Sequence, residues 1–162
     1  MLENCKSARE RWGGVSQIVD RWLEQRQQLI VEFCTACGIH ALDSEDDPQK
    51  GMHHFCELLV DYISAGHFEV YDHLIQEAEE FSDGSALELA KQIYPELSQT
   101  TEIALAFNDH VETLHDDNAN DPELARKLSK LGEALVTRFE LEDQLVDKLH
   151  YSHQELMVSS EA

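Results

Sequence analysis

The stretch LLVDYISAGHFEVY, residues 58–71, carries an amphipathic helical pattern into a Ser-Ala-Gly-His break and resumes it beyond without leaving the apolar register. A glycine inside a helix costs about 1 kcal/mol relative to alanine, so Gly66 requires a compensating role. Close packing and recognition of a partner are both compatible with the pattern. The segments on either side of the break are either one kinked helix or two helices.

The rest of the chain is also helical in period. Only three prolines and seven glycines interrupt the 162 residues, and the apolar residues between them recur at helix spacing rather than alternating. Expected boundaries are a stop at Gly38, a break at residues 82–85 with Ser85 as N-cap, and a last helix from Pro122 to about Met157.

Pro95 falls within the helical pattern that follows Ser85, where it either ends or kinks a helix. These segments predict an all-α fold: an antiparallel bundle of four main helices with a short N-terminal helix and a Pro-kinked extra segment. The length of 162 residues indicates a single domain over residues 1–162.

The composition is that of a globular but strongly acidic protein. Apolar residues make up 42%, and 12 Lys and Arg face 33 Asp and Glu, for a formal charge of −21. Such a surface repels phosphates, so we expect no direct contact with nucleic acid or membrane and a basic protein surface as partner. Solubility alone is an equally good explanation of the charge.

The N-terminus is polar, and no apolar run is long enough to span a bilayer, which favours a cytoplasmic protein with reduced cysteines. Cys34 and Cys37 have C-x-x-C spacing without a second ligand pair or a preceding strand, so they are interpreted as small buried packing residues.

A di-iron site needs two Glu-x-x-His motifs, and the chain has one, from Glu112 to His115; residues 147–150 match only with Asp in place of Glu. Phosphate loops and nucleophile elbows are absent from the sequence. We therefore expect no metal, no cofactor, no catalytic residue and no enzyme activity.

Several charged residues fall on or near apolar helix faces. Following three-four spacing, they are Arg26 on the first helix, Asp61 and His67 near Gly66, and Arg138 and Glu142 on the last helix. Buried charge is costly unless it is paired, so these five residues could form a polar network inside the bundle or at one mouth. Such a network could be structural, or it could be a small-molecule or metal sensor; a bundle enzyme is a third, weaker alternative.

Taken together, the motifs resemble the Rsd/AlgQ family. The resemblance rests on VDRWL (19–23), LVDYISAGHF (59–68) with Tyr71, Tyr94-Pro95, GEAL (132–135), Arg138-Phe139 and LED (141–143). It covers nearly the whole chain, and the N-terminal MLE-x-C and ERWGGV pieces look closer to the AlgQ branch, named for alginate regulation.

The resemblance implies an anti-sigma factor that binds the C-terminal promoter-reading domain of the housekeeping sigma factor of RNA polymerase. It also implies that Asp61, Ser64 and Phe68 contribute to the partner surface, with His67 beside them; Arg21 and Trp22 would border it. Asp61 would accept from a basic side chain and Phe68 would be the apolar anchor. The free protein is expected to be a monomer or a weak dimer.

Overall fold

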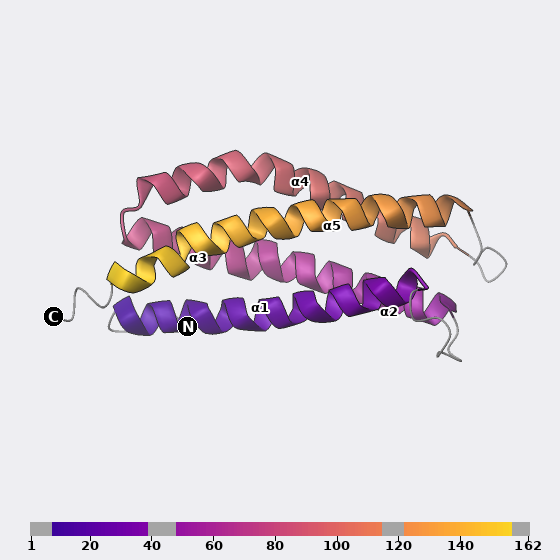
Figure 1. Ribbon diagram of the computed structural model, residues 1–162, viewed down its shortest axis with the longest axis horizontal. Coiled ribbons are helices and arrows are strands. Elements are labelled where there is room, and N and C mark those ends of the chain that lie inside the picture. The colour runs from indigo at the N-terminus through magenta and orange to yellow at the C-terminus, as the bar shows by residue number, and fades with distance from the viewer. Residues whose placement is uncertain (1–7, 39–47, 115–121, 157–162) are drawn as a thin grey trace.

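The computed structural model describes residues 8–38, 48–114 and 122–156, and these are helical apart from short turns (Figure 1). The elements are, in order, α1 (Ala8–Ala36), α2 (Pro48–Ala65), the π-helical turn η2 (Gly66–Val70), α3 (Tyr71–Glu80), α4 (Gly84–Glu112), α5 (Pro122–Leu149) and the 3-10 turn η4 (Tyr151–His153). Neighbouring long helices run in opposite directions (Figure 1). The expected all-helical bundle of four main helices is therefore confirmed.

The break at Gly66 is a π-helical turn within one continuous helical stretch, so α2, η2 and α3 form a single long element. The Tyr71 N–H donates to the Gly66 carbonyl, the five-residue spacing of a π-helix. A Cβ on Gly66 would stand 3.3 Å from the Tyr71 hydroxyl and 3.4 Å from the Trp22 ring. Close packing therefore explains the glycine.

The helix ends follow local backbone chemistry. Gly38 adopts a positive φ of 79° just after α1, as expected for a C-terminal stop. At residues 82–85 the structure corrects the expected N-cap: the Asp83 side chain, rather than that of Ser85, accepts from the Ala86 N–H. The Ser85 hydroxyl instead donates to the same Asp83 carboxylate at 2.9 Å.

Two other sequence expectations change. Pro95 lies inside α4, which continues through it as one helix, so it does not mark a separate segment. The last long helix ends at Leu149 rather than near Met157, because the chain turns at His150 into η4. A separate short helix before α1 would fall outside the described residues, as do His115 and Asp121.

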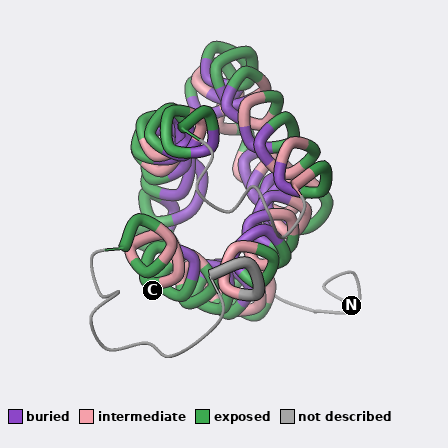
Figure 2. Tube along the Cα trace, turned by 90° about the vertical axis from the view of Figure 1, so that its right-hand side faces the viewer, coloured by how far each residue is buried: buried purple, intermediate pink, exposed green. Residues whose placement is uncertain are grey.

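The core is one cluster of buried side chains contributed by all the long helices. α1 packs along α2, and α4 packs along α5. Figure 2, an end-on view, shows the buried segments facing the inside of the bundle and the exposed segments facing outward. Among the described residues, no helix is long and apolar enough to cross a membrane.

Candidate partner surface and the buried ion cluster

The exposed side of α2 and η2 carries three of the residues expected to bind a partner. Asp61 is exposed, Ser64 is half-buried, and Phe68 is 83% exposed, the highest value among the large exposed hydrophobic residues described. Their spacing of three and four residues places them along one side of a helix. A phenylalanine exposed to this extent is accessible to a partner, and aromatic residues are enriched in the buried cores of protein interfaces.

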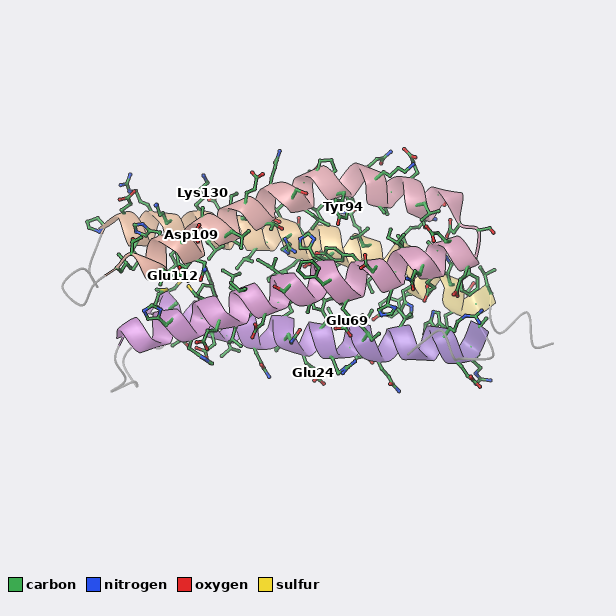
Figure 3. The ribbon with its side chains drawn as sticks, turned by 180° about the vertical axis from the view of Figure 1, so that it is seen from behind. Glu24, Glu69, Tyr94, Asp109, Glu112 and Lys130 are labelled. Carbon is green, nitrogen blue, oxygen red and sulfur yellow. The ribbon has the colours of Figure 1, made fainter. Side chains whose placement is uncertain are left out.

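The two flanks of this surface come from α1 and α4. The guanidinium of Arg21 on α1 lies 3.9 Å from the carboxylate of Glu69, and both side chains are exposed. Figure 3 shows Glu69 on the side of the η2 turn that faces α1, with Tyr94 on α4 across the turn. Trp22 was expected to border this surface. Instead it is 2% exposed and stacks on the Tyr62 ring inside the core.

His67 links the exposed turn to the interior. Its ring packs edge-on against Tyr71, with centroids 5.1 Å apart, and against Tyr94 at 6.3 Å. Its Nε2 atom lies 3.0 Å from the Thr101 hydroxyl on α4. Burial, together with the nearby Arg138 cation, lowers the pKa of His67, which favours the neutral ring.

Beneath this turn, Glu142 on α5 is the centre of a buried ion cluster. Its carboxylate accepts from the Tyr62 hydroxyl at 2.5 Å and from the Tyr71 hydroxyl. The guanidinium of Arg138 lies 3.3 Å away and that of Arg26 3.4 Å. Burial raises the pKa of Glu142, and the two cations and two hydroxyls oppose that shift. The Glu142 carboxylate is thus bound by two hydroxyl groups and two guanidinium groups.

Arg138 on α5 connects this cluster to α4 through hydrogen bonds. It is fully buried, and its Nη1 donates to the hydroxyls of Thr101 at 2.8 Å and Thr100 at 3.1 Å and to the Leu97 carbonyl at 3.4 Å. Its Nη2 donates to the Tyr71 hydroxyl at 3.1 Å. A buried guanidinium is tolerated when its charge is paired and its donors find acceptors. Here Nη1 and Nη2 find these four acceptors, whereas Nε makes no hydrogen bond and faces the Glu142 carboxylate as an ion pair only.

Arg26 spans the seam between α1 and α5. Its guanidinium donates to Asp143 at 2.5 Å and to the Tyr62 hydroxyl at 3.0 Å, and it lies over the rings of Trp22 and Phe139. The structure therefore unites Arg26, Arg138 and Glu142, as the spacing suggested. Asp61 is not part of the cluster, because its side of α2 faces solvent.

A second buried cluster, which the sequence did not predict, closes the end of the bundle where α3 and α5 terminate. The Glu77 carboxylate lies 2.6 Å from His150 Nδ1 and 2.8 Å from His153 Nδ1, and His153 Nε2 lies 2.9 Å from Asp83. Trp12 stacks on the His150 ring. The only available signal was the two histidines near the C-terminus, which an uninterrupted helix would have placed elsewhere.

Within the described ranges, no group of three or more His, Cys, Asp or Glu is arranged to hold a metal ion. Cys34, Cys37 and Cys56 are free thiols there; Cys34 is half-buried and Cys37 is exposed, so the two are not the buried packing residues that the sequence suggested. Beside the η2 turn, a groove of about 680 Å³ lies between α3 and α4. Its lining residues are Ile75, Glu79, Leu87, Ala90, Lys91, Tyr94, Pro95 and Ser98.

A helical bundle with an acidic surface and an exposed phenylalanine has a surface on which another protein can bind. Comparison with known proteins identifies the family to which the chain belongs. The chain belongs to the Rsd/AlgQ family, because the family model described as "Regulator of RNA polymerase sigma(70) subunit, Rsd/AlgQ" matches residues 1–150. This is a family of regulators, not enzymes.

Individual relatives agree. The chain is 38% identical over 148 residues to the protein named "Regulator of sigma D" from Yersinia enterocolitica, covering 90% of this chain and 88% of the relative. The proteins of the same name from Yersinia pestis and from an Enterobacter species are also 38% identical over 148 residues. They cover 90% of this chain and 87% and 88% of the relatives, respectively.

Proposed function

We propose that this protein is an anti-sigma factor that binds the C-terminal promoter-reading domain of the housekeeping sigma factor and limits its use. The match of residues 1–150 to the family of sigma(70) regulators carries this proposal. A domain that reads promoter DNA has to be basic. A chain with a net charge of −21 is electrostatically complementary to such a domain and can compete with DNA for it.

The proposed contact surface is the exposed side of α2 and η2. Phe68, 83% exposed, inserts as the apolar anchor, while Asp61 accepts from a basic side chain and Ser64 lies between them. Charge steers the encounter and the anchor supplies affinity. Binding should therefore weaken with added salt, because screening shortens the range of the attraction.

A binding measurement with separated sigma domains tests partner and surface together. The C-terminal domain should bind, and Asp61→Lys and Phe68→Ala should each weaken binding while circular dichroism shows an intact fold. Asp109→Lys is the matched control, because it makes the same charge change at a different place on the bundle. Asp109 lies on α4, fifteen residues after Tyr94 (Figure 3). At the rise of an α-helix, this is about 22 Å along the helix. Equal affinities for Asp61→Lys and Asp109→Lys would remove Asp61 from the interface.

The proposal extends to cell compartment and branch. A regulator of polymerase acts in the cytoplasm, and the free protein is proposed to be a monomer or weak dimer. The N-terminal pieces MLE-x-C and ERWGGV support the AlgQ branch. The sensor alternative is less favoured, because the charged groups of the Glu142 cluster already bind one another.

A further inference from the structure

The position of Phe68 is determined by the backbone of the η2 turn, not by contacts of its own ring. With 83% of its surface exposed, the side chain has little packing to hold it. The neighbouring residue is the opposite: the His67 ring is half-buried and packs against both Tyr71 and Tyr94. The placement of the turn, and of the phenylalanine on it, therefore depends on how the inward residues of the turn are held: Gly66 and Val70 are buried in the core, and His67 adds polar and ring contacts.

The hydrogen bonds at Thr101 determine which atom of His67 carries a proton. The Thr101 hydroxyl donates its one proton to the Leu97 carbonyl at 3.1 Å. Its oxygen is then an acceptor, at 2.8 Å from Arg138 Nη1 and 3.0 Å from His67 Nε2. His67 must therefore donate through Nε2–H, so Thr101 fixes both the tautomer and the orientation of the ring.

Arg138 holds Thr101 in this arrangement. Its guanidinium is fully buried and bound by Glu142, the Tyr71 hydroxyl and Thr100. A continuous path of polar contacts thus runs from the α5 carboxylate, through Arg138 and Thr101, to the turn that displays the exposed phenylalanine.

We propose that Thr101 and Arg138 are positioning residues for partner binding: acting through His67, they hold the η2 turn so that Phe68 stands ready to enter the sigma domain. This inference rests on the proposed function. A preorganised anchor loses less conformational freedom on binding, which raises affinity without adding a contact.

The test compares two substitutions at Thr101. Thr101→Val keeps the shape but removes the acceptor, whereas Thr101→Ser keeps the hydroxyl. With the C-terminal sigma domain as probe, Thr101→Val should bind about tenfold more weakly, and Thr101→Ser should bind within about twofold of the unmodified protein. In nitrogen-detected NMR spectra, the His67 Nε2–H signal should persist in the serine variant and be lost or shifted in the valine variant.

A thermal-unfolding measurement ensures that all variants are compared while fully folded. If Phe68→Ala weakens binding but Thr101→Val binds like the unmodified protein, the positioning role is wrong and the proposed surface stands. If Phe68→Ala also binds normally, the proposed surface is wrong. Failure of the unmodified protein to bind the sigma domain would overturn both proposals.

Discussion

The Glu77 carboxylate on α3 lies 2.6 Å from Nδ1 of His150, just beyond the end of α5, and both side chains are almost completely buried. Burial raises the pKa of Glu77 to about 7 and lowers the pKa of His150 to about 4. Both shifts favour the uncharged forms. The pair therefore closes this end of the bundle without a net charge over much of the acidic range.

The two shifts have opposite consequences for stability. Glu77, with a raised pKa, contributes stability that is fully present below about 4.5 and is lost as the pH rises to about 7. His150, with a lowered pKa, contributes stability that is present above about 6.5 and is lost as the pH falls to about 4. Between pH 4.5 and 6.5 the two dependences cancel.

Replacing Glu77 by Gln removes the contribution of Glu77 to the pH dependence of stability and leaves that of His150. As the pH rises from about 4.5 to about 7, we expect the stability of the variant to increase relative to the unmodified protein, by an amount on the order of 2 kcal/mol. Urea unfolding across this range measures the difference. Glu79→Gln, on the exposed side of the same helix, shows what loss of a surface charge does by itself. If the stability difference between Glu77→Gln and the unmodified protein did not change with pH, the pKa of Glu77 would not be raised in the folded protein.

The Arg138–Glu142 pair is expected to be strongly coupled. Glu142→Gln leaves a buried cation, and Arg138→Met leaves a buried carboxylate, so each should cost on the order of 3 kcal/mol of unfolding free energy. The double variant removes both charges and should cost less than the sum of the singles by at least about 1 kcal/mol. Urea unfolding of all four proteins completes the cycle, and strict additivity would show that the two charges do not stabilise each other.

Much of the fold followed from the period of the apolar residues, because helix faces in a bundle are marked directly by three-four spacing. The same spacing identified Arg26, Arg138 and Glu142 as charges beside the core. It could not identify Tyr62 and Tyr71 as their partners, since a tyrosine on an apolar face has the same pattern whether or not its hydroxyl is used.

Other features depend on contacts between distant segments. The family resemblance implied that Trp22 borders the partner surface, but its place is set by Tyr62 forty residues later. The Glu77 cluster forms only because α5 ends at Leu149, one residue before the chain turns at His150, although the apolar stripe gives no such signal. Thr101 joins His67 across 34 residues. Local sequence does not encode these pairings.

Gly66→Ala should destabilise the protein even though alanine is the better helix former. The added methyl would meet the Tyr71 hydroxyl at 3.3 Å and the Trp22 ring at 3.4 Å. Neither ring is free to move, because both are buried and bonded to other residues. We expect a loss of about 1–3 kcal/mol on thermal or urea unfolding.

The matched control is Gly13→Ala on α1, where an added methyl meets nothing within 4 Å. Helix propensity alone then acts, and this variant should gain up to about 1 kcal/mol. A gain of similar size at Gly66 would mean that the neighbouring rings yield, and close packing would no longer explain the glycine.

Arg26→Lys tests whether the α1–α5 seam needs a guanidinium or only a positive charge. Arg26 contacts Asp143, Glu142 and the Tyr62 hydroxyl at once and lies over two aromatic rings, an arrangement that a single ammonium group cannot reproduce. We expect a loss of about 1–2 kcal/mol in urea unfolding. Arg21→Lys, at an exposed ion pair, should change stability by less than about 0.5 kcal/mol. Equal effects at the two positions would show that charge, not geometry, holds the seam.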